Sequence, residues 1–163
     1  MKTNAYTVPD YSHYKLDEEK SRLQAFLKEA NLVMPENFYS LIRIGDVIDL
    51  YTNPPELKQL YCNDEFRKLC SYSENDLKTK PFPVLFWRDD EIQQLLAQRM
   101  GQSAFAGTTA EPWNIPVHEL VESLHPRKRT FEIDMGAIAP IFDAKTNERK
   151  AFASSLRVSL IFE

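Results

Sequence analysis

Two histidines, His118 and His125, stand seven positions apart in the sequence. On a single helix this spacing would bring both imidazoles to one face, where they could bind a metal ion or ligate a haem iron. The sequence offers no third ligand or carboxylate partner for them, and histidines without such partners are usually surface or capping residues. We therefore expect no metal site and no haem.

The two cysteines, Cys62 and Cys70, are eight positions apart and belong to no CxxC motif. This arrangement indicates neither a disulfide scaffold nor a structural zinc site. No lysine or histidine stands directly beside either cysteine to lower the pKa of its thiol. Because free cysteines are most often small core residues, we expect both thiols to be reduced and buried.

The sequence nominates no catalytic residue. It contains no phosphate-binding loop, nucleophile elbow, zinc-protease motif or glycine-rich dinucleotide motif. The first hypothesis is therefore a non-enzymatic module. The alternative is a small cone-like α+β enzyme or carrier whose bent sheet wraps a hydrophobic molecule. In such an enzyme the acid and the base would have to come from His118, His125 or Asp134.

Composition excludes several classes of protein. Of the 163 residues, 43% are apolar and 27% are charged, which is typical of a soluble globular domain. A formal charge of -4 gives no electrostatic footprint for nucleic acid or an anionic membrane. No apolar stretch approaches the ~20 residues of a membrane span, and the N-terminus lacks the apolar segment of a signal peptide. We expect a cytoplasmic protein that binds neither nucleic acid nor membrane.

The N-terminal quarter of the sequence predicts an arm followed by an amphipathic helical extension. Residues 1–14 have no periodicity, whereas apolar residues recur at helical spacing from Leu16 onward. This helix ends before Pro35, and a second short helical turn follows it. We assign residues 1–43 to the extension and residues 44–163 to the domain.

The centre of the sequence predicts a hairpin and two capped helices. Residues 46–52 and 57–62 are rich in β-branched and aromatic residues, and a proline-containing turn separates them. Asn63 can cap the helix that follows the hairpin. Ser73 with Asp76 has the form of a capping box for a second short helix.

Less regular sequence follows these helices. Two prolines within 81–87 argue against a central strand. A helix is predicted from Asp89 or Asp90 to Gly101. Residues 101–116 predict a loop of a length typical of lids, binding segments or disordered stretches. Apolar residues within 117–124 predict one more short helix.

The C-terminal part predicts long strands with one buried face. Apolar and polar residues alternate over 131–135 and again over 152–162. A polar connection at 144–149 has the length of a hairpin turn, and Gly136 could mark a bend or a bulge. Two strands, several short helices and two or three further strands predict an α+β fold with one antiparallel sheet and its helices grouped on one face.

The stretch 61–77, YCNDEFRKLCSYSENDL, resembles the signature of the PAS family. In that signature a strand leads into Asn, an aromatic residue, Leu, a Gly-Tyr-Ser turn and a short acidic helix. The corresponding residues here are Asn63, Phe66, Leu69, Tyr72, Ser73 and Leu77. Ser71 stands where the family commonly has Gly, which alters the turn without disturbing the pattern.

The resemblance extends over 46–162 through the order of strands and helices. It implies a PAS-like five-stranded antiparallel sheet, and a sensory or regulatory module that senses a small ligand or contacts another protein. It also implies that the N-terminal helix serves a homodimer or a protein partner. The light-sensing branch of the family has a reactive cysteine in a Gly-x-Asn-Cys-Arg-Phe type motif. Residues 78–83 lack that cysteine, so we expect no flavin of the light-sensing type.

Aromatic residues gather in the helical block that would close over the sheet. They could line a pocket for a small apolar ligand or fill a core that holds none, and a filled core is commoner because packed interiors leave few voids. The candidates for such a pocket are Phe66, Tyr72, Phe86, Trp87, Trp113, His118 and Phe131. The sequence identifies neither the ligand nor a cofactor.

Overall fold

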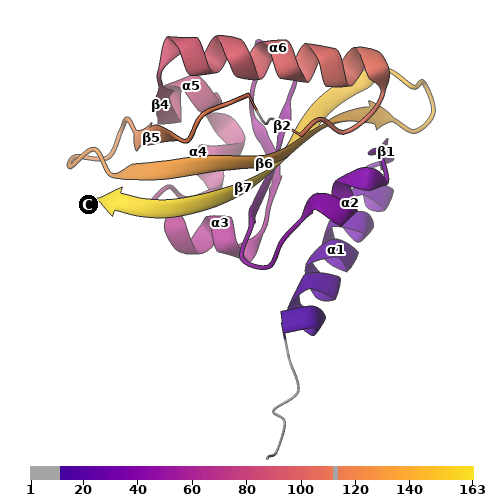
Figure 1. Ribbon diagram of the computed structural model, residues 1–163, viewed down its shortest axis with the longest axis horizontal. Helices are drawn as coiled ribbons and strands as arrows, with labels where there is room; N and C mark the ends of the chain where they lie inside the picture. The colour runs from indigo at the N-terminus through magenta and orange to yellow at the C-terminus, as the bar shows by residue number, and fades with distance from the viewer. Residues whose placement is uncertain (1–11, 112–113) are drawn as a thin grey trace, which may run out of the picture.

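The computed structural model describes residues 12–111 and 114–163, so the arm expected at 1–14 lies almost entirely outside the described residues. The described chain forms a seven-stranded antiparallel sheet with helices on both faces (Figure 1). Its helices are α1 (Ser12–Glu29), α2 (Asn37–Leu41), α3 (Asp64–Leu69), α4 (Glu74–Thr79), α5 (Phe82–Leu85) and α6 (Asp90–Ala106). Its strands are β1 (Leu32–Val33), β2 (Val47–Thr52), β3 (Gln59–Cys62), β4 (Phe86–Arg88), β5 (His118–Glu122), β6 (Thr130–Asp143) and β7 (Arg149–Phe162).

The strands lie in the order β3-β2-β7-β6-β5-β4, and β1 pairs with β6. The strand that opens the domain therefore lies beside the last one, with Val47 of β2 opposite Leu156 of β7. Two strands, β2 and β3, precede the helical block, and β5, β6 and β7 follow it. The α+β class and the PAS-like order of five strands are confirmed. The short strands β1 and β4 were not predicted.

The hairpin of β6 and β7 forms the centre of the sheet (orange to yellow in Figure 1). Each strand has 14 residues. The register shifts between Met135 and Ala137, so the predicted bulge at Gly136 is confirmed. A Cβ atom at Gly136 would lie 2.9 Å from the backbone oxygen of Ser155, which explains why glycine stands there.

Capping side chains fix the starts of the two short helices after the hairpin. The Oδ1 atom of Asn63 accepts a hydrogen bond from the backbone N–H of Phe66 at 3.2 Å and another from Ile48 at 3.0 Å. The hydroxyl of Ser73 accepts from the backbone N–H of Asp76 at 3.1 Å. Both predicted caps are confirmed, and Asn63 also ties α3 to β2.

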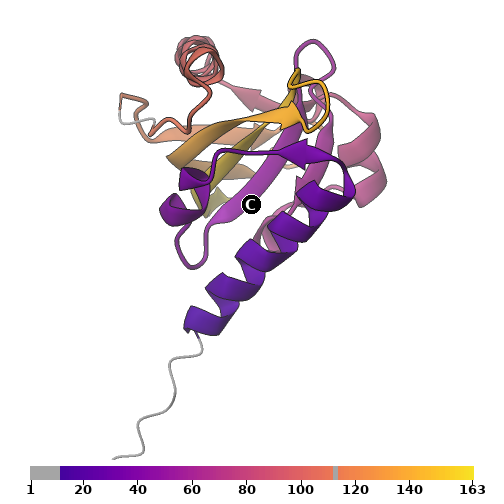
Figure 2. The same ribbon diagram turned by 90° about the vertical axis from the view of Figure 1, so that its right-hand side faces the viewer.

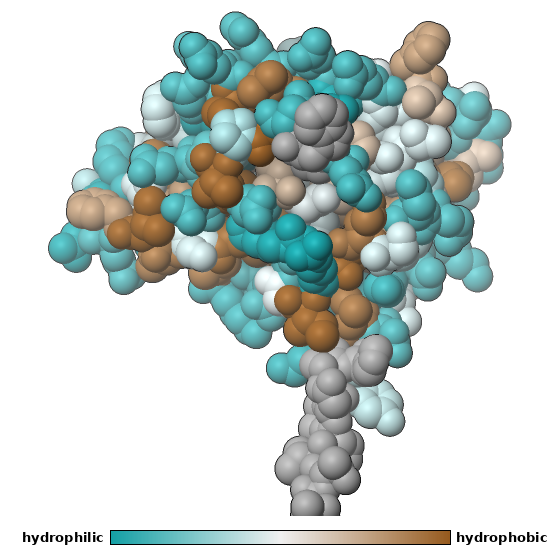
Figure 3. All heavy atoms as spheres, in the orientation of Figure 1, coloured by the Kyte–Doolittle hydropathy of each residue, from teal (hydrophilic) through white to brown (hydrophobic). Residues whose placement is uncertain are grey.

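Helix α6 is longer than predicted. It continues through Gly101 and ends at Gly107, whose φ of 67° is left-handed. A glycine inside a helix costs only about 1 kcal/mol, whereas a left-handed C-cap strongly favours glycine. The loop predicted over 101–116 is therefore wrong in its first part. The outward side of α6 is mainly hydrophilic (top of Figure 3), and no helix among the described residues combines the length and hydropathy of a membrane span.

Residues 117–124 do not form the predicted helix. They contain β5, which pairs with β6 through His118 opposite Ile133 and Leu120 opposite Phe131. In so short a segment, apolar residues three and four positions apart fit a helix or a partly buried strand equally well. Pairing with β6, which follows β5 after a short turn, decides for the strand.

Helix α1 covers the outer face of the sheet (Figure 2). Leu23 and Leu27 of α1 are buried in one cluster with Ile48 and Leu50 of β2 and with alanines of β6 and β7. The predicted extension thus packs on its own domain. Helices α3 to α6 cover the inner face, where a second apolar cluster lies.

Candidate ligand cavity

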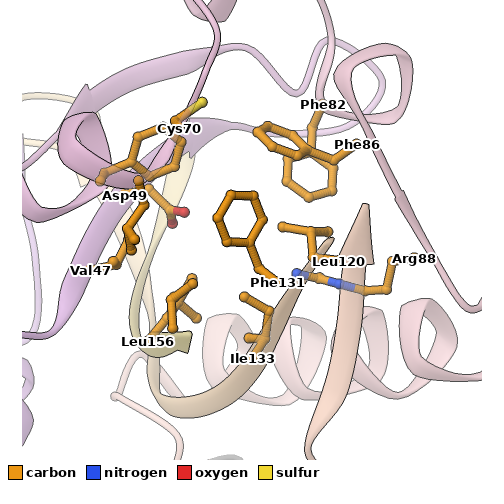
Figure 4. Close-up of a pocket in the computed structure, with 13 residues that line it drawn as sticks. Val47, Asp49, Cys70, Phe82, Phe86, Arg88, Leu120, Phe131, Ile133 and Leu156 are labelled. Carbon is orange, nitrogen blue, oxygen red and sulfur yellow. The ribbon is translucent and has the colours of Figure 1, made fainter. Parts of the chain in front are cut away.

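A cavity lies between the inner face of the sheet and helices α3, α5 and α6 (Figure 4). It has two adjoining chambers that share Asp49, Phe82, Arg88 and Leu156. The chamber beside α6, here the α6 chamber, has a volume of about 320 Å³. The chamber next to α3, here the aromatic chamber, has about 40 Å³. Since ligand pockets begin at about 300 Å³, the α6 chamber has room for a small molecule.

Three of the predicted pocket residues, Phe66, Phe86 and Phe131, line the aromatic chamber. They come from α3, β4 and β6, which the fold brings together around one space. All three are buried, and the ring of Phe86 lies 5.0 Å from that of Phe82. The chamber therefore has aromatic walls made by separate elements.

Asp49 places a carboxylate in the apolar wall of both chambers. Side chains alternate along β2, so Val47, Asp49 and Tyr51 face the cavity while Ile48 and Leu50 face α1. Asp49 is only 6% exposed. A carboxylate at this depth costs free energy unless another group pairs with it.

Arg88 reaches the cavity from β4, and its neighbour Trp87 points away and is 55% exposed. The guanidinium carbon of Arg88 lies 5.4 Å from the centre of the Phe82 ring. Its Nε atom is buried without a hydrogen-bond partner. Figure 4 shows the guanidinium of Arg88 and the carboxylate of Asp49 turned toward the same space.

Asp49 and Arg88 do not pair with each other. Among the described residues, neither side chain has a hydrogen-bond partner, and no ion pair within 4.0 Å joins the two. Burial raises the pKa of Asp49 to about 7, although the charge of Arg88 acts to lower it. Burial also lowers the pKa of Arg88 to about 10. Near neutral pH the wall carries a charged guanidinium and a partly protonated carboxyl group.

Tyr72 supports the cavity wall from behind and does not line it. Its ring lies 5.3 Å from that of Phe86. Its hydroxyl donates to the backbone oxygen of Leu85 at 2.5 Å and accepts from the backbone N–H of Leu124 at 3.0 Å. Tyr72 thus holds α5 against the end of β5. Trp87, on the exposed side of β4, does not line the cavity either.

His118 is buried on β5, outside the residues that line the chambers. Its Nδ1 atom lies 2.9 Å from the backbone oxygen of Pro116, its Nε2 atom has no partner, and burial lowers its pKa. Because residue 118 belongs to a strand, the helix face predicted for His118 and His125 does not exist. Trp113 falls outside the described residues.

The three nominees for acid–base catalysis lie in different surroundings. His118 is buried, whereas His125 lies in the turn after β5 and accepts a hydrogen bond from the backbone N–H of Arg127 at 3.1 Å. Asp134 is largely exposed on β6, 3.9 Å from Arg157. The structure brings no two of these nominees together at one site.

Both cysteines are free, with Cys62 buried and Cys70 partly buried. Burial raises the pKa of Cys62 to about 11 and that of Cys70 to about 12. Cys70 lines the aromatic chamber, yet its thiol stays protonated at neutral pH and is a weak nucleophile. Within the ranges that the structure describes, no three His, Cys, Asp or Glu side chains form a group that could hold a metal ion.

Sequence reasoning missed Asp49 and Arg88, which carry the polar chemistry of the cavity. For Asp49 a signal was present, because it is the one charged residue in the strand 47–52 and shares the parity of Val47 and Tyr51. Arg88 had no such signal. It precedes two aspartates in a segment where no strand was predicted, so it resembles an ordinary surface charge.

Comparison with known proteins gives structural matches only, since no family model and no curated protein matches the sequence. The light-state dimer of the fungal blue-light photoreceptor Vivid matches with 12% identity and a TM-score of 0.48, over 71% of this chain and 79% of that chain. A domain of a Haloarcula marismortui histidine kinase, described as light and redox sensing, matches with 20% identity and a TM-score of 0.41, over 69% and 88%. A fungal LOV domain photoreceptor matches with 14% identity and a TM-score of 0.39, over 68% and 72%.

These matches correct one expectation about cofactors. Two of these matches are blue-light or LOV photoreceptors, and they contradict the expectation that excluded a flavin of the light-sensing type. The missing motif concerns only a cysteine that would react with a bound ring. Whether a ring system binds depends on the walls and polar groups of the cavity, which a local motif does not encode.

The assignment of the fold rests on topology. The order β3-β2-β7-β6-β5, the helices capped by Asn63 and Ser73, and the cavity under these helices all occur in one chain. The same order was expected from the succession of strands and helices over 46–162. The chain therefore has a PAS-like fold.

Proposed function

We propose that this chain is a sensory or regulatory module that holds a small molecule in the cavity beneath α6. One observation carries the proposal: the cavity wall contains two charged groups, Asp49 and Arg88, that have no hydrogen-bond partner among the described residues. Buried charges in proteins are normally paired or hydrogen-bonded, because desolvation is otherwise costly. A ligand that pairs with them would explain why both residues are tolerated there.

The volume of the α6 chamber supports the same proposal. A core built only for stability fills its space at nearly crystalline density, whereas this chamber keeps about 320 Å³. Gln93, Ala97 and Met100 of α6 line one side of the chamber. Since Ala97 lines the chamber and is also exposed on α6, a larger side chain there would reduce the free space without disturbing the core.

The sheet itself is the route by which occupancy would reach the surface. Strand β2 presents Asp49 to the cavity and Ile48 and Leu50 to α1 on the opposite face. A ligand that moves β2 would therefore also move the surface on which α1 packs. We extend the proposal to a homodimer or protein partner that contacts the outward, polar side of α1, because its apolar side faces its own sheet.

A neutral fluorescent probe tests whether the cavity binds small molecules. We expect 2-naphthol to bind the purified chain at a single site, and Ala97→Phe to weaken this binding by about fivefold or more. Gln94→Phe introduces the same side chain at an exposed position of α6 that does not line the cavity, so it should leave the affinity unchanged. Equal affinity for both variants and the original chain would contradict the proposal.

Native mass spectrometry and visible absorbance of the same preparation provide an independent check. A small molecule that co-purifies with the chain, and is lost in Ala97→Phe but kept in Gln94→Phe, supports the proposal. A molecule retained equally by both variants would mean that it binds elsewhere. The oligomeric state, measured by light scattering with and without ligand, tests the extension to a partner.

A further inference from the structure

The two unpaired groups of the cavity identify a class of ligand. We propose that the cavity binds a small aromatic or aliphatic carboxylic acid, whose carboxylate pairs with the guanidinium of Arg88 and whose apolar body lies along α6. The inference rests on the proposed function, since it requires that the cavity hold a ligand at all. It goes further by assigning the chemistry of that ligand.

Arg88 selects an anion. A guanidinium presents N–H donors in a planar fork that matches a carboxylate, and hydrogen bonds between charged groups are about twice as strong as those between neutral ones. The Nε atom of Arg88 has no hydrogen-bond partner, and the guanidinium lies over the face of Phe82. Arg88 is the single cationic residue in the lining of either chamber, so one carboxylate fits the site better than a doubly charged phosphate.

When Asp49 is protonated, its carboxyl group can also bind the carboxylate of the ligand. Burial raises its pKa to about 7, so near neutral pH a substantial fraction carries a proton that can be donated to the second carboxylate oxygen. The titratable or charged groups that face Asp49 are Arg88 of β4, Tyr51 of β2, Cys62 of β3 and Cys70 after α3. Burial raises the pKa of each of the last three, so none of them is charged near pH 7. Strand β7 contributes the neutral Ser154 opposite Asp49.

The remaining walls require an apolar body. Side chains that line the α6 chamber include Leu96, Met100, Met135, Ile138 and Phe152. The chamber volume lies at the low end for ligand pockets, which fits a compact acid. An acid whose carboxylate lies between Arg88 and Asp49 would extend its body into this chamber.

Matched acids and amides test the inference by isothermal titration calorimetry. The probes are phenylacetic, 2-naphthoic and octanoic acids, each compared with its primary amide. We expect at least one acid to bind about tenfold or more tightly than its amide, the difference expected for charge-assisted hydrogen bonds to one group. Arg88→Met should reduce the affinity for that acid to the level of its amide and leave the amide unchanged. Arg127→Met, at an exposed turn position, should change neither affinity.

The possible results separate the inference from the proposed function. If an amide binds as tightly as its acid, or Arg88→Met weakens both equally, the carboxylic-acid inference is wrong while the cavity remains a ligand site. If no probe binds and 2-naphthol also fails, the proposed function falls and the inference falls with it. Asp49→Asn is the second variant. It should bind the preferred acid at least as tightly as the original chain at about pH 8, where Asp49 is ionised, and weaker binding would contradict the role given to Asp49.

Discussion

Two buried carboxylates on the inner face of the same sheet have opposite surroundings. Glu122, at the end of β5, is fully buried and forms an ion pair with Arg129 at 2.8 Å. The hydroxyl and backbone N–H of Ser71 also donate hydrogen bonds to Glu122. Asp49, in the cavity wall, is nearly as buried but has neither a hydrogen bond nor an ion pair among the described residues. The fold thus gives one buried acid several partners and leaves the other without a hydrogen bond or an ion pair among the described residues.

The difference separates the structural role of Glu122 from the binding role that we propose for Asp49. Arg129 also donates to the backbone oxygen of Leu69 at 3.1 Å, so the Glu122 cluster joins β5 to the loop after α3. Breaking such a pair leaves an uncompensated charge and costs stability. Asp49 lowers stability whenever it is ionised, and this cost makes sense where a bound molecule can offset it.

The largest expected effect is the loss of the paired acid. Glu122→Ala should lower the free energy of unfolding by about 3–5 kcal/mol, because it leaves the guanidinium of Arg129 buried without its partner. Urea denaturation measures the change. Glu163→Ala removes an exposed carboxylate 3.8 Å from the same arginine and should cost less than about 0.5 kcal/mol. If both variants lost a similar free energy of unfolding, the structural role given to Glu122 would be contradicted.

The unpaired acid should respond in the opposite direction. Because its pKa is raised to about 7 in the folded chain, Asp49 binds its proton more tightly there than in the unfolded chain. Its contribution to stability is therefore present in acid and is lost as the pH rises through about 7. Asp49→Asn should raise the free energy of unfolding by about 4 kcal/mol at about pH 8 and change it little at about pH 4. Destabilisation at the higher pH would show that the carboxylate has a partner.

Asp46 is a second buried acid with partners, and Gly136 packs against two of these partners, Ser155 and Arg157. Asp46 accepts a hydrogen bond from the hydroxyl of Ser155 at 2.8 Å and lies 3.6 Å from Arg157. In Gly136→Ala the new methyl group would contact the backbone of Ser155 and approach Arg157, and overpacking of this kind costs about 1–3 kcal/mol. Gly101→Ala, in open space on α6, should instead stabilise the chain by about 1 kcal/mol. Thermal unfolding of both variants should move in opposite directions.

The smallest effect is expected beside Arg88. Trp87 is exposed on β4, so Trp87→Thr should change the free energy of unfolding by less than about 0.5 kcal/mol and leave ligand affinity unchanged. Chemical denaturation and calorimetry check both points. A clear loss of affinity would place Trp87 in the site, as the sequence predicted, and would contradict the inward direction given to Arg88 alone.

Local signals in the sequence were sufficient for much of the fold. The hairpin of β2 and β3, the caps Asn63 and Ser73, and the bulge at Gly136 each depend on residues close to one another in the chain. The features that failed were decided by residues outside the segment concerned. Residues 117–124 became a strand because β6 pairs with them, and α6 passed Gly101 because Gly107 provides the better cap.

For the same reason, the sequence predicted only some of the residues that line the cavity. Phe66, Phe86 and Phe131 were nominated as aromatics, and the structure places them in one wall. The polar pair could not be found in this way, because Arg88 faces Asp49 only after β4 joins β5 at the edge of the sheet. A charged residue in the middle of an apolar strand, as at Asp49, is the local signal that could have indicated a polar group in the cavity.

The most direct test of the unpaired carboxyl group is a pH titration of its side-chain carbon resonance by NMR. In the empty protein we predict that Asp49 titrates with a midpoint near 7, and that saturation with the preferred carboxylic acid raises this midpoint further. A midpoint near the ordinary value of about 3.9, unchanged by ligand, would mean that Asp49 is solvated or paired. That result would contradict the account of a cavity that reserves its charged groups for a bound molecule.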